Sequence, residues 1–233
     1  MVARRDEGSG GRWGEHNAER RRAIMDALVE LIEEAEPGAE ISLQEIADRA
    51  GLKRSVIYRH FADRAELDAR TREYLVESYI GTLMPTLELE DSVRETVYRA
   101  VHTYVTLVAA HPRLHRWVEQ GPGSHDPSGV VVVAGTKEAV AQRISALFTP
   151  AAALFGQADP AIDLAAFAVV STVDGTVTRW LRTRPDGWDA DQVSRALTDS
   201  LVMLLEGHAR NRGIAVDADL PIGELLAQAA DRS

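Results

Sequence analysis

The sequence predicts an all-α protein, with a small three-helix domain at the N-terminus followed by a larger C-terminal helical bundle. Apolar residues recur at helical spacing along most of the 233-residue chain, and this periodicity is the main sequence signal of helices. Capping boxes open several of these segments, and Pro and Gly separate them. We therefore expect about nine to ten helices in all.

The N-terminal domain is expected to span residues 17–64, after a disordered arm over residues 1–16. The arm is rich in Gly and Arg and shows no apolar periodicity, as is typical of disordered segments. Beyond it, an apolar repeat that includes Ile24 and Leu28 continues until Pro37. This repeat predicts the first helix, from about residue 18.

Two short helices follow, joined by a glycine turn. Ser42 and Glu45 have the spacing of a capping box at the start of the second helix. Gly51 supplies the turn, because a residue without Cβ adopts positive φ at little cost. The third helix runs from about Lys53 to His60 and is unusually basic. This layout is typical of a helix-turn-helix DNA reader.

The second domain, residues 65–233, is expected to be helical throughout. Asp63, Asp91 and Asp189 are the predicted N-caps of three of its helices. Residues 130–133 have the β-branching of a strand, but four residues make a poor isolated strand, so we assign them to the start of a helix. The predicted helices cover residues 63–83, 91–111, 113–119, 130–148, 161–184, 189–210 and 220–230.

The charge pattern favours local binding of DNA over general coating of it. The net charge of −10 argues against a non-specific nucleic-acid protein, which needs many cationic contacts. Basic residues nevertheless gather in and near the helix-turn-helix, and a basic patch on an acidic body fits a site-specific binder. These residues are Arg20, Arg21, Arg22, Lys53, Arg54, Arg59 and Arg64.

The composition also predicts where the protein works. There are no cysteines, which suits a reducing compartment. We find no apolar run of the roughly 18 residues needed to span a bilayer, and the N-terminus lacks the apolar core of a signal peptide. We expect a cytoplasmic protein with no membrane partner.

A set of residues within the segment IADRAGLKRSVIYRHFADRAEL is typical of one family. The matched positions are Ile46-Ala47, Ala50-Gly51, Tyr58, His60, Phe61 and Arg64. The segment resembles the DNA-binding domain of the TetR family of bacterial transcriptional regulators. One position departs from the family pattern, because Val56 lacks the hydroxyl that often meets a phosphate there.

Eight side chains are predicted to contact DNA. A recognition helix presents its N-terminal turns to the major groove, so Arg54 is the candidate for bidentate readout of a guanine. The resemblance implies phosphate contacts for Tyr58 and His60, and Arg64 is expected to meet a phosphate beside the next helix N-terminus. The full set is Gln44, Lys53, Arg54, Ser55, Tyr58, Arg59, His60 and Arg64.

Each of these assignments has a simpler alternative. Lys53 and Arg54 would serve equally as solvated surface charges, Ser55 as a helix cap, and Tyr58 as a packing residue. Outside the motif, Arg20 to Arg22 are candidates for further phosphate or minor-groove contacts.

The resemblance implies a homodimer, in which helices 161–184 and 189–210 form a four-helix interface with the same pair of a second subunit. A two-fold dimer reads a palindromic operator with two recognition helices. The alternative is that these helix faces pack within one subunit. The predicted interface residues are Ala168, Thr172, Gly175, Val193, Leu197, Leu201 and Leu204.

Aromatic and polar residues on the C-terminal helices are candidates for lining a small-molecule pocket, with core packing as the alternative for each. An acid within the apolar run VVSTVDGTV should not be buried unpaired. Asp174 therefore faces the pocket, pairs with an arginine across the dimer, or lies in solvent. The candidates are Tyr98, His102, Tyr104, Trp117, Phe148, Phe155, Phe167 and Asp174.

No catalytic residue, metal site or cofactor is predicted. His111 and His115 have the spacing of a helical metal pair, but Pro112 breaks the helix between them. Residues 124–126 read Ser-His-Asp, yet adjacent residues cannot converge as a triad. The sequence also lacks the phosphate-binding and nucleophile-elbow motifs.

The predicted function is that of a homodimeric transcriptional repressor, released from its DNA operator by a small-molecule effector of unknown identity. The alternatives are an activator or a ligand-independent regulator. A helical small-molecule carrier with a vestigial helix-turn-helix is a third possibility.

Overall fold

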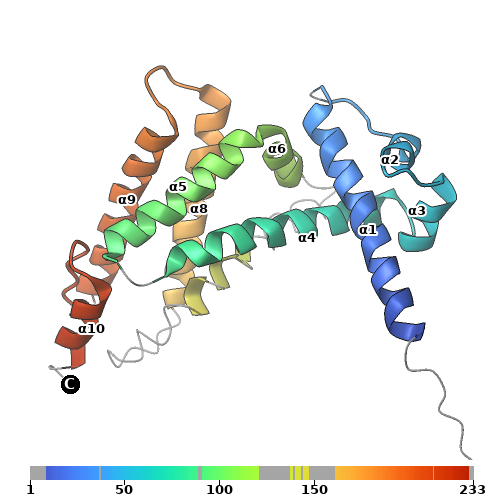
Figure 1. Ribbon diagram of the computed structural model, residues 1–233. Helices are drawn as coiled ribbons and strands as arrows, with labels where there is room; N and C mark the ends of the chain where they lie inside the picture. Colours follow the sequence, from blue (N-terminus) through green and yellow to red (C-terminus); the bar gives the residue numbers. More distant parts are fainter. Residues whose placement is uncertain are drawn as a thin grey trace, which may run out of the picture. The chain divides into compact units, whose positions relative to one another are not determined.

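The structure is a computed structural model of the chain and describes residues 9–36, 38–88, 91–120, 137, 138, 140–142, 144–146, 161–211 and 213–230. Within these residues the protein is all-α, as predicted (Figure 1). None of the described helices is long and apolar enough to cross a membrane. The elements are α1 (Ser9–Glu34), α2 (Leu43–Arg49), α3 (Arg54–His60), α4 (Arg64–Leu83), the 3₁₀ helix η1 (Met84–Leu87), α5 (Val93–Ala110), α6 (Pro112–Gln120), α8 (Ala161–Thr183), α9 (Ala190–Arg210) and α10 (Ile222–Ala230).

The chain forms two compact units. The first comprises Met1–Leu75 and Arg113–Pro122, and the second comprises Val76–Pro112 and Gly123–Ser233. The first half of α4 thus belongs to the first unit, and so does α6, although α6 follows α5 directly in the chain. This division differs from the expected boundary at residue 64, which assigns all of α6 to the bundle.

Local signals shape the helix-turn-helix as the sequence predicts. The Ser42 hydroxyl accepts a hydrogen bond from the Glu45 amide at 3.2 Å, and the Glu45 carboxylate accepts one from the Ser42 amide at 2.7 Å. These bonds complete the capping box. The Ser42 hydroxyl also donates to the Glu45 carboxylate at 2.7 Å, and this bond, with that from the Ser42 amide, holds the pKa of Glu45 below its usual value. Gly51 adopts a φ of 64° in the turn, a conformation that an L-residue rarely takes.

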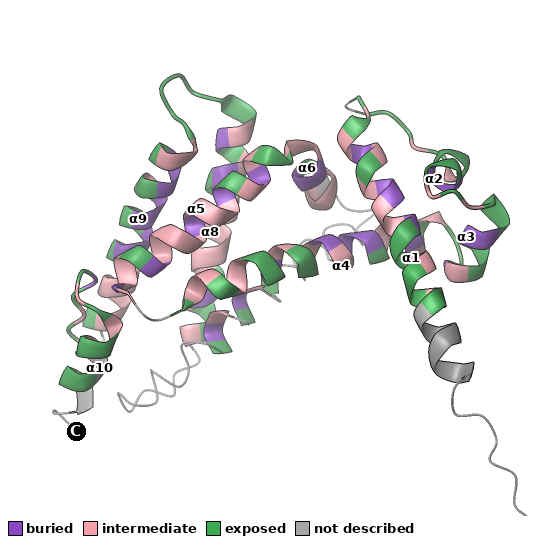
Figure 2. Cartoon of the chain, viewed as in Figure 1, coloured by how far each residue is buried: buried purple, intermediate pink, exposed green. Residues whose placement is uncertain are grey.

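The core of the first unit joins α1, α2 and α3. Ile24 and Leu28 of α1, Ile46 of α2 and Ile57 of α3 are almost fully buried, and Phe61 belongs to the same cluster. Figure 2 shows buried positions on each of these three helices. Burial of such side chains is the main favourable term in packing short helices together. The core therefore fixes which face of α3 remains in solvent.

The second unit packs α5 against α9, with α8 beside both. Their contact faces carry aliphatic residues at helical spacing, as expected for a bundle core. The buried cluster consists of Val101, Val105, Val108, Val177, Trp180, Val193, Leu197 and Leu201.

The helix caps of the second unit confirm one prediction and correct another. Asp189 accepts from the Gln192 amide at 2.9 Å, which completes the predicted capping box of α9. The N-cap of α5, however, is Ser92 and not Asp91. The Asp91 carboxylate pairs with the Arg99 guanidinium and is not the cap of α5.

Two further helix boundaries differ from expectation. Helix α1 begins at Ser9, nine residues before the predicted start, because adding residues to an established helix is far easier than starting one. Helix α6 begins at Pro112 itself, where proline fits because the first helical amide needs no acceptor. Residues 1–8, residues 130–133 and Pro160 lie outside the described residues.

Candidate nucleic-acid interface

Helix α3 has one buried face and one free face. Val56 and Ile57 are 8% and 1% exposed, whereas Lys53, Arg54 and Ser55 are all exposed. Val56 therefore packs in the core of the domain. Its burial accounts for an apolar residue at a position where the TetR family, which this segment resembles, often has a hydroxyl. The first turn of the helix is left as a basic, solvent-facing edge.

The Arg54 side chain contacts a residue of its own helix, Tyr58. Its guanidinium donates to the Tyr58 hydroxyl at 3.0 Å and lies 5.7 Å from the centre of the Tyr58 ring. Tyr58 is 49% exposed, so the structure does not use it as a core residue. Both side chains project from the free face of α3.

The remaining polar residues of the reading motif are also accessible. Lys53 is the N-cap residue of α3, and no side chain caps that helix. The alternative that Ser55 serves as the cap is therefore not realised. Gln44 of α2 is exposed and donates to Asp48 at 2.8 Å, a bond that is easily exchanged at a surface.

His60 lies at the end of α3 among arginines. Burial lowers its pKa most, and the charges of Arg21, Arg20 and Arg59 lower it further. Arg21 also lies 5.0 Å from the centre of the Phe61 ring, which anchors α1 to the end of α3. The structure thus gathers arginines from α1 and α3 around one neutral imidazole, a setting that attracts anions.

Arg64 is engaged in a different way from that predicted. It is half-buried, its Nε lies 2.7 Å from the Asp68 carboxylate, and it also donates to the Ile41 carbonyl. These bonds tie the start of α4 to the loop that precedes α2. The predicted phosphate contact would have to compete with both of them.

The predicted pocket residues of the second unit divide into two contact groups. Tyr98 donates to Asp191, stacks on His102 at 5.4 Å between ring centres, and joins α5 to α9. Tyr104 donates to Asp174 at 2.9 Å, and Lys137 lies 2.6 Å from the same carboxylate. Asp174 is thus half-buried and paired within its own subunit with Lys137, while its pairing with an arginine across a dimer stays a prediction.

The other predicted pocket residues are more scattered. Trp117 lies on α6 in the first unit, where it packs against the core of the helix-turn-helix domain. Phe167 is 38% exposed on α8. Phe148 and Phe155 lie outside the described residues.

The predicted interface residues fall into two groups, which differ in how far they are buried. Val193, Leu197 and Leu201 are buried in the core of their own subunit against α5 and α8, so the alternative of packing within one subunit holds for them. Thr172 and Gly175 are exposed on α8, while Ala168 and Leu204 are half-buried.

Comparisons with known proteins agree with this arrangement. Residues 24–70 match the family model described as bacterial regulatory proteins, tetR family. An uncharacterised HTH-type transcriptional regulator of Mycobacterium tuberculosis is 26% identical over 208 residues, which cover 87% of this chain and 82% of that protein.

Solved structures share the fold. A tetR-family transcriptional regulator from Streptomyces coelicolor aligns with a TM-score of 0.64 at 18% identity, over 92% of this chain and 89% of the other. The regulator FadR from Bacillus subtilis, in complex with stearoyl-CoA, aligns with a TM-score of 0.62 at 18% identity, over 78% and 97% of the two chains. Residues 24–70 of the chain therefore form a DNA-binding domain of the tetR family of bacterial regulatory proteins, and the chain shares the fold of solved regulators of that family.

Proposed function

We propose that the protein is a homodimeric repressor that binds a palindromic operator and is released from it by a small molecule. The observation that carries the DNA-binding part is the free face of α3, where Lys53, Arg54 and Ser55 stay exposed while Val56 and Ile57 are buried behind them. A helix held in this way enters the major groove with its N-terminal turns toward the base edges.

The proposed contacts divide by role. Arg54 reads a base, because its guanidinium has donors for both acceptors of a guanine once it leaves Tyr58. Tyr58, Arg59 and His60 hold phosphates, with Lys53, Ser55 and Gln44 as neighbouring contacts. Arg64 contributes by holding the loop before α2 in place, and a phosphate contact from it would be secondary.

The surfaces of α8 and α9 support the dimer. Leu164, Phe167 and Met203 are 72%, 38% and 66% exposed, and an apolar surface of this kind favours burial against a partner. Thr172 and Gly175 lie on the exposed side of α8, where small side chains allow close helix approach. We place the subunit interface there, with Ala168 and Leu204 at its edge.

Release by a ligand requires that the ligand bind two states of the protein with different affinity. The fold neighbour FadR holds stearoyl-CoA, which supports a ligand-binding role for the second unit. We assign the effector site to the helical bundle that contains Tyr98, His102, Tyr104 and Asp174. Their present contacts hold α5, α8 and α9 together, so a ligand that displaced them would loosen the bundle.

The test of the DNA-binding role is fluorescence anisotropy with duplex DNA from upstream of the protein's own gene. We expect salt-sensitive, sequence-selective binding. Arg54→Ala should weaken it by about five-fold or more and relax the preference at one base position, since a bidentate guanine contact contributes about 1–3 kcal/mol.

The matched control is Arg195→Ala, which removes the same charge from α9, where Arg195 pairs with Asp191 at 2.9 Å. Its operator affinity should equal that of the wild type. Absent or salt-insensitive binding by the wild type would favour the carrier alternative. Unchanged affinity and preference in Arg54→Ala would remove Arg54 from base readout.

A further inference from the structure

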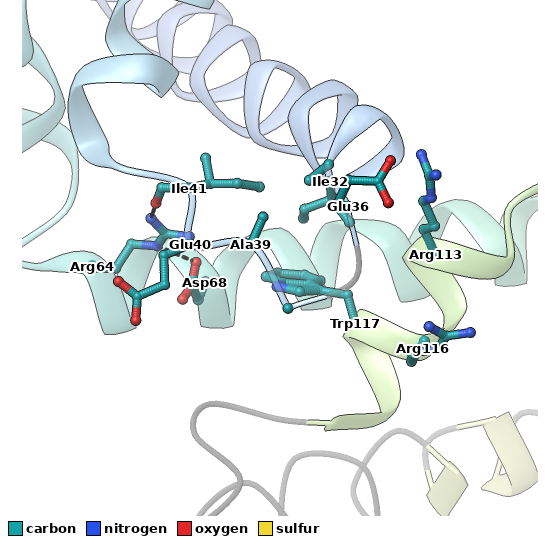
Figure 3. Close-up of a pocket in the computed structure, with 12 residues that line it drawn as sticks. Ile32, Glu36, Ala39, Glu40, Ile41, Arg64, Asp68, Arg113, Arg116 and Trp117 are labelled. Atoms are coloured by element: carbon teal, nitrogen blue, oxygen red, sulfur yellow. Dashed lines mark hydrogen bonds and ion pairs between the residues drawn. The ribbon is translucent and has the colours of Figure 1, made fainter.

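The first unit contains a pocket that DNA binding does not explain. It has a volume of about 390 Å³ and lies between the C-terminal end of α1, the loop before α2, the start of α4, and α6 (Figure 3). All of its lining residues belong to the first unit. Its volume falls within the range of small-molecule sites.

The pocket has an apolar wall that suits a flat ring. Trp117 extends from α6 toward Ala39 of the loop, and Ile32 and Ile41 complete this side (Figure 3). Indole rings bind other aromatic groups by offset or edge-to-face contact. Ala39 is exposed, so part of this apolar wall is open to an incoming molecule.

The cations around the pocket are incompletely paired. Arg113 donates to the Glu33 carbonyl, and Arg116 has no partner among the described residues. A guanidinium carries five N–H donors, so most donors of these two side chains have no protein partner among the described residues, and those of the exposed Arg116 are open to solvent or a ligand. Both residues lie on α6, the helix that carries Trp117.

A third arginine reinforces this charge. Arg72 of α4 is 3% exposed and lies 4.0 Å from the centre of the Trp117 ring. Its Nε and one terminal nitrogen are buried without a hydrogen-bond partner among the described residues. A buried cation with open donors is costly unless an anion compensates it.

The acids of the pocket supply this compensation only in part. Burial lowers the pKa of Arg72 by more than the charge of Asp68 raises it, and Asp68 is already paired with Arg64 at 2.7 Å. Glu36 and Glu40 are both exposed to solvent, where water screens their charge, and neither forms an ion pair within the described part of the chain. The Trp117 side of the pocket therefore carries excess positive charge, which an anionic ligand would neutralise.

We propose that this pocket binds a small aromatic carboxylate, with its ring against Trp117 and its carboxylate on Arg116. A guanidinium matches a carboxylate with two parallel hydrogen bonds, and the apolar wall accepts the ring. The site differs from the effector site assigned to the second unit, and its existence does not depend on the proposed repressor function.

The experiment is isothermal titration calorimetry of the full-length protein with 1-naphthoate as the probe. We expect a Kd below about 1 mM, the affinity that even modest binding per atom gives for a ligand of this size. The neutral analogue 1-naphthalenemethanol should bind about ten-fold more weakly, because it lacks the charge that the arginines hold. Tighter binding of the cation 1-naphthylmethylammonium than of 1-naphthoate would overturn the charge assignment.

Two variants locate the site. Arg116→Gln should weaken 1-naphthoate about five-fold and leave the neutral alcohol unchanged. Ala39→Leu fills the pocket from an exposed loop position and should weaken both probes more than ten-fold. The control is Arg70→Gln, an exposed arginine of α4 that is paired with Glu73 at 2.8 Å, and it should bind both probes like the wild type.

Thermal melting of each variant establishes that the fold is intact before its binding is measured. If 1-naphthoate fails to bind the wild type up to 1 mM, or binds Ala39→Leu with unchanged affinity, no such site exists in this pocket. If Arg116→Gln and Arg70→Gln weaken binding equally, the effect comes from overall charge, and the assignment to Arg116 is wrong.

Discussion

Arg54 donates a hydrogen bond to the Tyr58 hydroxyl one helical turn further along, at 3.0 Å. The pair sits on an exposed surface, where water competes for such a bond, so the bond contributes little to stability. It restricts the directions of the guanidinium, and this would reduce the entropy lost in the base contact proposed for Arg54. The same pair explains why Tyr58 stays exposed although it is aromatic.

His60 provides a pH-dependent prediction at the residue scale. Its pKa in the folded protein is lowered by burial and by Arg21, Arg20 and Arg59, whereas the unfolded chain has the ordinary value of about 6.5. The unfolded state thus binds more protons below neutral pH, and the folded state loses stability as pH falls through about 6.5. The wild type should therefore lose more thermal stability between pH 7.5 and 5.5 than His60→Gln, as measured by circular dichroism.

The control for this prediction is His208→Gln, the same substitution at a half-buried position of α9 in the second unit. Its pH dependence should follow that of the wild type. Equal losses of melting temperature in the wild type and in His60→Gln would contradict the prediction.

At the scale of single elements, the start of α5 shows how two adjacent residues compete for one role. Asp91 and Ser92 are both good N-caps, and the structure uses Ser92, whose hydroxyl accepts from the Glu95 amide at 3.2 Å. Asp91 pairs instead with Arg99, which lies eight residues further along, in α5. Arg99 also donates to the Thr86 carbonyl at 3.0 Å and so secures η1.

Removing this cap is expected to destabilise the second unit. Ser92→Ala leaves the first amides of α5 without their side-chain acceptor, and the typical cost of such a loss is about 1 kcal/mol. Urea denaturation should show a free energy of unfolding that is lower by this amount. Ser78→Ala, at an exposed position within α4, is the matched control and should leave the free energy unchanged or slightly raise it. A Ser92→Ala protein as stable as Ser78→Ala would assign the cap to another group.

The elements that the sequence predicts correctly depend on neighbours within a few residues. Ser42 with Glu45, Asp189 with Gln192 and the turn at Gly51 are all of this kind, and all three are confirmed. Such signals are local, because capping and positive φ are decided within one turn of chain. They are sufficient to establish the all-α class and the helix order.

The candidate site is predicted less completely because its partners are distant in sequence. The exposed edge of α3 follows from the apolar spacing of Val56 and Ile57. The spacing does not predict that Arg64 donates to the Ile41 carbonyl or that Trp117 packs in the first unit, since these contacts join segments 23 and more residues apart. The pair of Arg64 with Asp68, at (i, i+4), was a signal in the sequence that could have found part of this.

On the scale of the whole molecule, α4 and α6 connect the two units through the chain. Helix α4 contributes residues to both, and α6 belongs to the first unit while its preceding helix α5 belongs to the second. Under the proposed function, a ligand that shifts the bundle would reach the helix-turn-helix through these crossings of the chain. Coupling through such routes requires two states that both ligand and operator distinguish.

The proposed dimer gives the prediction at this scale. Met203 is 66% exposed on α9, and in an isologous interface the same side chain is contributed by both subunits. Met203→Glu thus places two like charges in one apolar contact, which opposes association. Light scattering at micromolar concentration should give twice the 25.5 kDa chain mass for the wild type and a mass near one chain for Met203→Glu.

Ala110→Glu, at an exposed position of α5, adds the same charge outside the proposed interface and should remain dimeric. A monomeric wild type, or a Met203→Glu protein that stays dimeric at every concentration tested, would place the interface elsewhere or remove it. Operator affinity provides a second readout, because a single subunit reads only one half-site and should bind far more weakly than the dimer.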